Sequence, residues 1–306
     1  MTKVMLVFGA RPNFMKIAPI FREMRERGGF EPVLVHTGQH FDEAMSDQFL
    51  RVLELPRPEV HLEVGSGTES WQTAQIITRL EPVLAELRPD AGVVVGDVTS
   101  TLAASLAMSF ARVPLAHVEA GLRSRDWSMP EERNRIVVDR ISQFLLTPSE
   151  DADDNLRAEG IERAKIHRIG NVMIDSLDWI LPRLDAQRVL ADYDLGEGDA
   201  FGLVTLHRAG NVDDDAVLKG LVGALADVAE RLPLLFPVHP RTKKRLDALG
   251  LSFDATGVRS LPPLSYSDFT ALMSRAALVL TDSGGIQEEA VVLGVPCLTL
   301  RDNTER

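Results

Sequence analysis

The chain has 306 residues, of which 45% are hydrophobic and 25% are charged, the composition of a globular protein of about two domains. Its 45 acidic residues outnumber its 33 basic residues, which gives a formal net charge of −12. This balance excludes a general nucleic-acid binder or anionic-membrane binder, because both classes need a broad basic face.

Short apolar runs alternate with amphipathic stretches along the whole chain. The runs contain Val, Ile and Leu without polar alternation, which indicates strands covered on both faces in a parallel sheet. The expected strands are 3–8, 32–36, 92–95, 114–118 and 144–147 in a first series, then 201–206, 234–238, 277–281 and 296–300 in a second. The expected helices include 14–27, 72–87, 213–231 and 286–293. This alternation predicts a doubly wound α/β fold.

The predicted domain boundary follows the first series of strands, near residues 169–171. A helix is expected at 171–184, followed by a polar linker at 185–199. We therefore expect two Rossmann-like lobes, residues 1–170 and 171–306, with an interlobe cleft where ligands lie at the carboxyl ends of the strands. The polar residues 301–306 directly follow a strand, which predicts that the C-terminal part of the second lobe is missing.

The N-terminal segment and the cysteine content both favour the cytoplasm. The apolar run in MTKVMLVFGARP is far too short to span a membrane, and it shows no signal-peptide pattern. The single cysteine, Cys297, lies in an apolar run and is expected to be a buried core residue. No disulfide can form within the chain, which suits a reducing compartment.

The loop after the first expected strand carries two cations. Gly9 and Pro12 suit a tight turn and a helix start around Arg11, and Lys16 follows on the helix. These cations are candidates to meet a diphosphate or a developing negative charge. The alternative for Lys16 is a solvated helix residue.

Three acidic residues are expected at one edge of the first sheet. Asp97 follows the strand at 92–95, Glu119 follows the strand at 114–118, and Glu131 opens a helix. Carboxylates that meet at one edge raise one another's proton affinity, which favours acid and base chemistry. The alternatives are a helix cap for Asp97 and compensation of the helix dipole for Glu131 and its neighbour Glu132.

The segment 278–300 contains a strand, a Ser-Gly-Gly turn and a helix. A helix N-terminus presents free backbone N–H groups and a positive dipole end to an anion, and the glycines allow close approach of a phosphate. Ser283, Gly284 and Gly285 are therefore candidate phosphate ligands, and Glu289 is a candidate for hydrogen bonds with a ribose. The alternative is an ordinary glycine-rich turn of a parallel sheet.

Two histidines of the second lobe follow expected strands. His207 and His239 are placed to donate to a phosphate or to move a proton, whereas a lone histidine is more often structural. The run 213–215 of three aspartates opens a long helix and is interpreted as N-terminal capping rather than as a metal site. No Cys/His spacing suggests zinc, so no metal is expected.

The motifs occur together in one order along the chain. They are FGARPNFMK, TGQH, GDVTSTL, HVEAGLRS, MPEERNR, HR at 207–208, PVHP, LTDSGGIQEEA and RDNTER. With this ordered set the sequence resembles the non-hydrolysing UDP-N-acetylglucosamine 2-epimerase family, together with its close relatives that act on modified UDP-N-acetylhexosamines. The resemblance covers residues 8 to 306 and implies the two-lobed fold of the glycosyltransferase-B class.

The resemblance implies an isomerase that eliminates UDP across C1 and C2 to give a bound glycal and then re-adds UDP to C1 with the proton delivered to the other face of C2. It implies no metal and no nicotinamide cofactor, a small-molecule UDP-sugar as partner, and a homodimer. The residues that handle the C2 proton would be Asp97, Glu119 and Glu131. The resemblance does not say which of them removes the proton and which returns it. Stabilisation of the diphosphate would come from Arg11, Lys16 and His207.

Further roles also follow from the resemblance alone. Ser283, Gly284 and Gly285 would hold phosphate, Glu289 the ribose, Phe269 the uracil, and Arg306 would contact the ligand. Activation by a second UDP-N-acetylglucosamine near Gln39, His40 and His239 is not expected, because Phe41-Asp42-Glu43 follows the QH pair. The alternatives are the same chemistry on a C3-amino or uronic acid sugar, a UDP-sugar glycosyltransferase of this fold, and an inactive nucleotide-sugar binding module.

Overall fold

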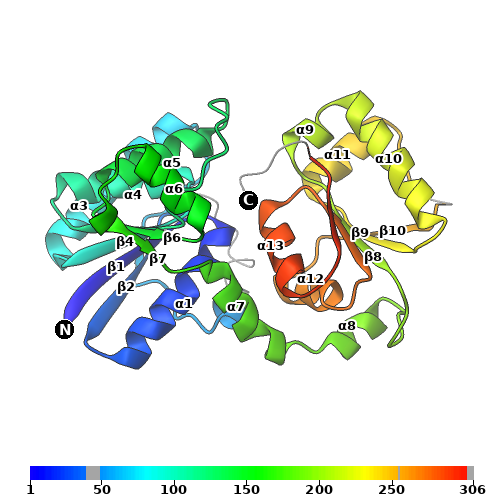
Figure 1. Ribbon diagram of the computed structural model, residues 1–306, viewed down its shortest axis with the longest axis horizontal. Coiled ribbons are helices and arrows are strands. Elements are labelled where there is room, and N and C mark those ends of the chain that lie inside the picture. The colour runs from blue at the N-terminus through cyan, green and yellow to red at the C-terminus, as the bar shows by residue number, and fades with distance from the viewer. Residues whose placement is uncertain (39–48, 254–255, 302–306) are drawn as a thin grey trace. The chain divides into compact units, whose positions relative to one another are not determined.

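The computed structural model describes residues 1–38, 49–253 and 256–301, and of Arg11 it describes only the backbone. The chain divides into two compact units, Met1–Trp179 and Ile180–Arg306 (Figure 1). The division lies later than the expected boundary at 170/171, because helix α7 (Val172–Ile180) packs against helix α1 (Arg11–Arg27) of the first unit. The buried Ser176 hydroxyl donates to the Met15 carbonyl, and the Arg22 guanidinium lies 3.6 Å from the centre of the Trp179 ring.

The described part of the first unit contains a seven-stranded parallel sheet with the order β3-β2-β1-β4-β5-β6-β7. Its strands are β1 (Thr2–Phe8), β2 (Phe30–His36), β3 (Val60–His61), β4 (Ala91–Val95), β5 (Leu115–Val118), β6 (Phe144–Thr147) and β7 (Ile166–Arg168). Besides α1 and α7, its helices are α3 (Glu69–Leu87), α4 (Thr99–Phe110), α5 (Pro130–Ile141) and α6 (Glu150–Ala158). The five strands expected from apolar runs are confirmed. The short edge strands β3 and β7 were not expected, because neither contains an apolar run.

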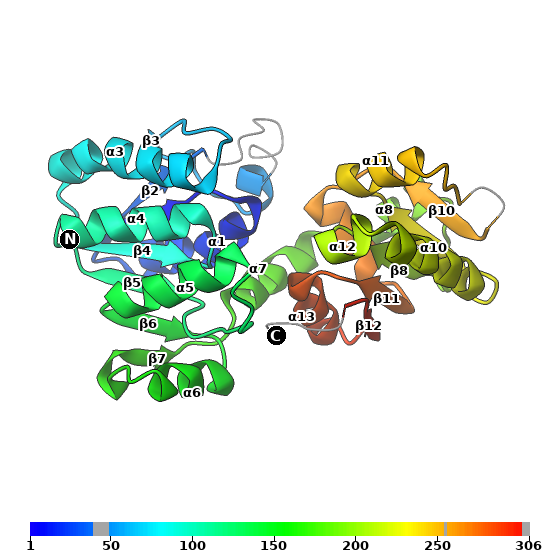
Figure 2. The same ribbon diagram turned by 90° about the horizontal axis from the view of Figure 1, so that it is seen from above.

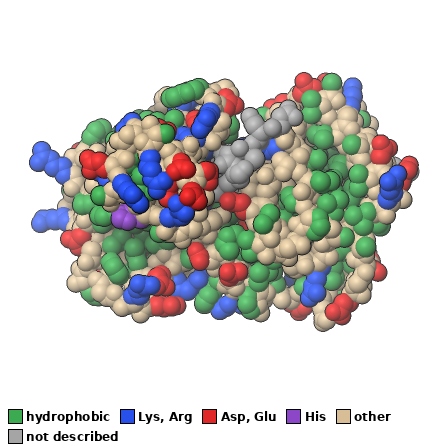
Figure 3. Space-filling view, in the orientation of Figure 1, with side chains coloured by type: hydrophobic (Ala, Val, Ile, Leu, Met, Phe, Trp, Pro, Cys, Tyr) green, Lys and Arg blue, Asp and Glu red, His purple; other side chains and the backbone are tan. Residues whose placement is uncertain are grey.

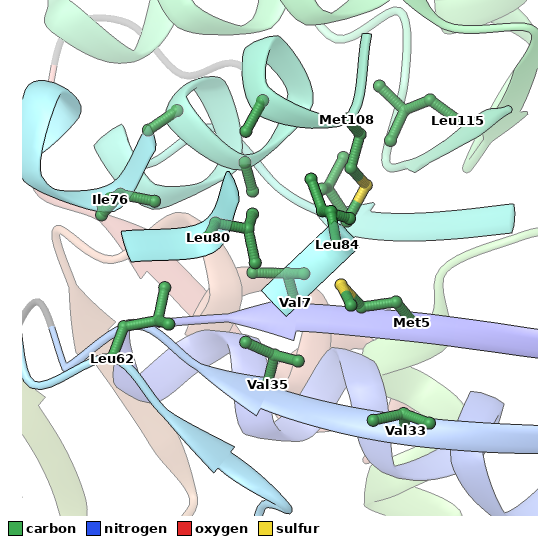
Figure 4. Packing of buried hydrophobic residues seen from close by; sticks show 14 of the residues in the cluster. Met5, Val7, Val33, Val35, Leu62, Ile76, Leu80, Leu84, Met108 and Leu115 are labelled. Atoms are coloured by element: carbon green, nitrogen blue, oxygen red, sulfur yellow. The ribbon is translucent and has the colours of Figure 1, made fainter. Parts of the chain in front are cut away.

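One face of this sheet is covered by α3, α4 and α5, which lie side by side (Figure 2). Met5 and Val7 alternate along β1 and point into the same apolar cluster (Figure 4). Other members of the cluster come from β2, α3 and α4, among them Val33, Val35, Ile76, Leu80, Leu84 and Met108. The α3 residues recur every four positions and so form one helix face. Helix α1 packs against β1, β2 and β4, and the sheet is therefore doubly wound as expected.

The second unit repeats the architecture on a smaller scale. In the described residues its parallel sheet has five strands in the order β10-β9-β8-β11-β12. The strands are β8 (Gly202–Thr205), β9 (Leu234–Pro237), β10 (Val258–Leu261), β11 (Leu278–Thr281) and β12 (Cys297–Thr299). The helices are α8 (Ala186–Asp192), α9 (Ala209–Val212), α10 (Asp215–Ala229), α11 (Pro240–Ala248), α12 (Tyr266–Met273) and α13 (Gly284–Val292). Apolar residues of α8, α12 and α13 form one core cluster, and those of α10 and α11 form another.

Two expectations for the second unit are wrong in detail. The expected polar linker 185–199 contains α8, which Asp185 caps by accepting a hydrogen bond from the Arg188 N–H. The helix forms because Val189 and Leu190 bury their side chains in the core, a tertiary effect that the polar composition hides. Cys297 is only partly buried, because it lies on the edge strand β12.

The visible surface carries interspersed acidic and basic side chains rather than one broad basic face (Figure 3). None of the helices in the described part of the chain has the length and apolar character needed to cross a membrane.

Gly121 allows a stability prediction for the first unit. Its φ is +83°, and a Cβ there would lie 2.4 Å from the carbonyl oxygen of Ala152. Gly160 has a φ of +78° but open space around it, so it isolates the backbone effect. We expect Gly160→Ala to lower the free energy of unfolding by about 1 kcal/mol. Gly121→Ala should cost at least about 1 kcal/mol more through overpacking.

Urea unfolding followed by tryptophan fluorescence measures this difference, because Trp71, Trp127 and Trp179 all lie in the first unit. Equal losses in the two variants would contradict the packing explanation.

Candidate functional site

The carboxyl ends of β1, β4 and β5 are neighbours in the first sheet, because β4 pairs in parallel with both other strands. The loop Gly9–Ala10 follows β1, Asp97 lies two residues beyond β4, and Glu119 directly follows β5. These segments share one edge of the sheet, where ligands of open parallel sheets bind. The topology therefore brings together the segments in which the candidate residues were expected.

A buried ion pair joins two of the candidates at this edge. The Lys16 ammonium on α1 donates to the Glu119 carboxylate, and the two residues are only 7% and 6% exposed. Lys16 is thus not the solvated helix residue of the alternative interpretation. The pair lies against the turn after β4, because a Cβ on Gly96 would lie 2.8 Å from Lys16 Nζ and 3.5 Å from Glu119 Oε2. A cation and an acid therefore meet in a partly desolvated position.

Glu119 itself has an unusual backbone conformation. Its φ is +68°, in the left-handed region that costs a non-glycine residue about 1 kcal/mol or more. Strain of this kind persists where the surrounding contacts fix the residue, and it is concentrated at functional sites.

Helix α5 supplies the partners of Asp97. Arg135 donates to the Asp97 carboxylate, and the Asn134 side-chain amide donates to the Asp97 carbonyl over 2.8 Å. Asp97 is therefore not a simple helix cap, and the N-cap of α4 makes no side-chain hydrogen bond. Glu131 lies in the first turn of α5, one turn before Arg135, and is partly exposed.

The neighbouring Glu132 has the structural role. It is buried and accepts hydrogen bonds from the Ser124 N–H, the Ser124 hydroxyl and the Arg125 N–H, at 2.8 to 3.0 Å. Of the two acids in the motif, Glu132 is therefore held by the loop before α5, whereas Glu131 is partly exposed.

A buried polar network behind these residues was not recognised in the sequence. His117 on β5 donates from Nε2 to the Gly96 carbonyl at 2.8 Å and from Nδ1 to Asp139 of α5 at 2.7 Å. Asp139 also pairs with Arg123 at 2.8 Å. The network links the turn before Asp97, the strand before Glu119 and the helix that carries Glu131. The signal in the sequence is that His117 lies two residues before Glu119, on a strand otherwise apolar.

In the second unit, the Ser-Gly-Gly turn lies at the carboxyl end of β11, an interior strand of the sheet. Ser283 is the N-cap of α13, its side chain makes no capping hydrogen bond, and its own N–H donates to Thr281 Oγ1 at 3.0 Å. The first N–H groups of a helix lack intrahelical acceptors and carry the positive end of its dipole. The turn thus has the geometry of an anion site formed by Ser283, Gly284 and Gly285.

His207 lies at the end of the adjacent strand β8 and is held by an aspartate that immediately precedes Ser283. His207 Nδ1 donates to Asp282 Oδ1 at 2.8 Å. Burial alone would raise the pKa of the Asp282 carboxyl, but the hydrogen bonds and charge of His207, with the Arg208 N–H, bring it below its ordinary value. The His239 ring centre is 6.0 Å from that of His207. The sequence did not single out Asp282, whose partner is 75 positions away.

Glu289 is buried on α13 with a tyrosine partner. It is 3% exposed and accepts a hydrogen bond from the Tyr266 hydroxyl at 2.9 Å. Burial raises the pKa of Glu289 to about 7, with a further contribution from Glu288 and an opposing one from the Tyr266 hydrogen bond. Phe269 lies one turn after Tyr266 on α12 and packs partly buried on the adjoining core. Glu289 is therefore poised between its neutral and charged forms near neutral pH.

The other sequence candidates divide into two groups. The aspartates 213–215 are taken up by capping and ion pairs, since Asp214 caps α10 while Asp213 and Asp215 pair with Arg241 and Arg245. This confirms their structural interpretation. Gln39, His40 and Arg306 lie outside the described residues, as does the side chain of Arg11.

Solved structures share this architecture. A UDP-N-acetylglucosamine 2-epimerase from Methanocaldococcus jannaschii, crystallised with UDP-GlcNAc and UDP, matches with a TM-score of 0.89 and 42% identity. The match covers all of this chain and 85% of that one. The enzyme from Neisseria meningitidis bound to UDP-GlcNAc matches with a TM-score of 0.91 and 33% identity, over all of this chain and 84% of that one. The fold is thus that of the two-lobed, glycosyltransferase-B-like nucleotide-sugar enzymes.

The sequence comparisons define the family within this class. A family model described as UDP-N-acetylglucosamine 2-epimerase matches residues 22–306. A UDP-2,3-diacetamido-2,3-dideoxy-D-glucuronate 2-epimerase from Pseudomonas aeruginosa is 42% identical, over 99% of this chain and 84% of that protein. A UDP-N-acetylglucosamine 2-epimerase from M. jannaschii is also 42% identical, over 99% and 85%. The chain belongs to the UDP-N-acetylglucosamine 2-epimerase family and is an epimerase, hence an isomerase.

The raised pKa of Glu289 predicts a pH-dependent stability. Between its ordinary pKa and about 7, the native state holds a proton that the unfolded state has released. The contribution of this group is therefore fully present below the ordinary pKa and falls as the pH rises through about 7. A shift of this size corresponds to about 3 kcal/mol.

We expect wild type to lose stability relative to Glu289→Gln between about pH 5 and about pH 8. Hydrogen exchange of the β8 and β11 amides measures the free energy of opening in the second unit. The exposed Glu197→Gln variant is the control and should follow wild type. A constant difference between wild type and Glu289→Gln across this range would show that Glu289 has an ordinary pKa.

Proposed function

We propose that the protein interconverts UDP-N-acetylglucosamine and UDP-N-acetylmannosamine. The observation that carries the proposal is the set of acids at the carboxyl edge of the first sheet, with Glu119 buried against Lys16 and Asp97 paired with Arg135. Family membership supports it, together with relatives of this name that match over nearly the whole chain. A UDP-sugar glycosyltransferase would need one base and an acceptor groove rather than several acids at one edge.

The proton at C2 of the sugar dictates the route. It is not adjacent to a carbonyl, so direct removal and return of this proton are very unfavourable. In the proposed route UDP leaves from C1 as the C2 proton is taken, which gives a glycal that stays bound. UDP then returns to C1 while a proton is delivered to the opposite face of C2. The route requires acids and bases at C2 and cationic or dipolar stabilisation of the departing diphosphate.

The first unit supplies the proton chemistry in this proposal. Asp97, Glu119 and Glu131 take and return the C2 proton, while Lys16 and Arg11 counter the charge that builds on the diphosphate. Lys16 is suited to this role because it already neutralises Glu119, and a small movement lets it share its hydrogen bonds with an incoming anion.

The second unit holds the nucleotide. Ser283, Gly284 and Gly285 bind phosphate through backbone and hydroxyl donors at the start of α13, with His207 beside them. Glu289 accepts hydrogen bonds from the ribose, Phe269 borders the uracil, and Arg306 contacts the ligand. The Tyr266 hydroxyl fixes the orientation of the Glu289 carboxylate.

Isotope exchange tests the reaction. The protein is incubated with UDP-N-acetylglucosamine in deuterated water, and the sugar is followed by NMR. We expect deuterium at C2 of both epimers, because the returning proton comes from a group that exchanges with solvent. A transferase leaves C2 protonated, and a module that only binds broadens the signals without exchange; either outcome would overturn the proposal.

Asp97 provides a mutational test with a matched control. Asp97→Asn keeps the shape of the side chain but cannot accept a proton, so exchange at C2 should fall by at least about 10²-fold. Asp90 lies at the opposite end of the same strand, where it accepts a hydrogen bond from the Lys3 N–H at 2.7 Å. Asp90→Asn should exchange at the wild-type rate. A near-wild-type rate in Asp97→Asn would remove Asp97 from the mechanism.

A second candidate substrate is the uronic acid form of a diacetamido sugar. It is favoured by the P. aeruginosa relative, which matches at the same 42% identity as the M. jannaschii enzyme. The chemistry at C1 and C2 is the same, so the two substrates differ only in the groups at C3 and C6. We expect kcat/KM to be higher for UDP-N-acetylglucosamine by at least about tenfold, the effect of one hydrogen bond or methylene-sized contact. A higher kcat/KM for the diacetamido-glucuronate would assign the second substrate.

We further propose that the enzyme acts in the cytoplasm as a homodimer. The family resemblance supports the dimer. Sedimentation equilibrium on the full chain tests the dimer.

A further inference from the structure

Asp282 is a completely buried carboxylate that the proposed chemistry has not used. It lies between β11 and the N-cap Ser283, and it is 0% exposed. It accepts hydrogen bonds from the backbone N–H groups of His207 and Arg208, each at 2.9 Å to Oδ2. The Asn211 amide donates to the same oxygen at 3.2 Å. An ionised carboxylate of this kind is stable only because donors surround it.

The other oxygen of the carboxylate has a different main partner. Oδ1 receives the His207 ring Nδ1 at 2.8 Å, whereas its backbone contact, with the His207 N–H, is longer at 3.2 Å. The three donors to Oδ2 are sufficient to anchor the loop that follows β8. The ring contact at Oδ1 is therefore an additional interaction that acts on the side chain of His207.

We propose that Asp282 is a positioning residue that fixes His207 with the proton on Nδ1, which leaves Nε2 as the nitrogen that meets the ligand. A carboxylate can only accept, so Nδ1 must donate whenever the contact is made. The backbone N–H of His207 is bound to the same carboxylate, and the ring is thereby held at two points. Since Nδ1 faces a buried group while the His207 side chain is 38% exposed, Nε2 lies on the open side of the ring.

The same residue also fixes the anion site. Asp282 is covalently joined to Ser283, so its burial sets where the first N–H groups of α13 begin. One carboxylate thus holds both the α13 turn and the ring of His207. This step rests on the proposed function, in which the diphosphate of UDP lies on these groups. Nε2 then accepts a proton or, once protonated, donates to a phosphate oxygen. Nδ1 does neither, because it is bound to Asp282.

The tautomer of His207 in the wild-type protein tests the proposal directly. The full chain is labelled with ¹⁵N-histidine, and long-range ¹H–¹⁵N spectra distinguish a ring nitrogen that carries a proton from one that does not. The His207 signals are those lost in His207→Ala. We expect neutral His207 to carry its proton on Nδ1, the less common tautomer of free histidine. A proton on Nε2 with a bare Nδ1 would overturn the proposal, and this result needs no variant of Asp282 to fold.

Binding of UDP, measured by calorimetry, separates positioning from scaffolding. Asp282→Asn should weaken binding by about tenfold, the effect of one charge-assisted hydrogen bond. In the His207→Ala background the same change should weaken binding by less than about twofold, because the residue through which Asp282 acts is absent. Equal losses in both backgrounds would mean that Asp282 only shapes the loop.

Asn211→Ala is the matched control, since it removes a contact to the same carboxylate without touching the ring. His207 should keep the wild-type tautomer in this variant, and loss of that tautomer would indicate general loosening of the loop rather than a specific effect of Asp282. Neither measurement involves turnover. A chain that binds UDP but shows no deuterium exchange would therefore overturn the proposed reaction on UDP-N-acetylglucosamine and leave the role of Asp282 to be decided by these spectra.

Discussion

Parallel strand pairing is the constraint on which the arrangement of this protein depends. In both described sheets every pair of neighbouring strands is parallel, so each crossover returns the chain to the same end of the sheet before the next strand begins. Every carboxyl end consequently opens at one edge. His207 and Asp282 become neighbours because their segments leave the adjacent strands β8 and β11. Lys16 and Glu119 meet in the same way across β4, since their segments follow β1 and β5, which flank that strand. The apolar core holds the strands in place, and the strands in turn determine where the polar side chains at their ends lie.

The buried charges are satisfied locally. Lys16 neutralises Glu119, Arg135 reaches Asp97, and four donors surround Asp282. A buried pair of this kind adds little net stability, since desolvation offsets most of the attraction, whereas loss of one partner is strongly destabilising. The stability of the fold alone therefore does not explain the pairs. They also fix side chains that a free carboxylate or ammonium would leave mobile.

The sequence predicts those parts of the fold in which local pattern and tertiary burial agree. The run before Gly96 is apolar on both faces of the sheet, and it forms β4 as expected. Helix α8 was missed because its polar composition suggests a linker, while two apolar residues and a cap are sufficient once a core is available. The positions of Asp97 and Glu119 at strand ends could be predicted as well, because the apolar runs that define the strands also define where they end.

The partners of these residues could not be predicted. Asp282 and His207 are 75 positions apart, and His117 and Asp139 are 22 apart on different elements. A hydrogen bond between such positions leaves no periodic signal in one sequence. Composition alone does not separate Glu131 from Glu132, because adjacent acids at a helix start are equivalent. The resemblance selected Glu131, and the structure adds the backbone contacts of Glu132.

Gly96 illustrates how such a site limits change. Its φ is +68°, and the nearest atom to any side chain placed there would be the nitrogen of Lys16. Even one methyl group would push the ammonium from its acid and force the β4 turn out of its conformation. A saturation library at this codon should therefore recover glycine almost alone, although the residue has no functional group to contribute. The absence of a side chain beside Lys16 is itself a requirement of the site.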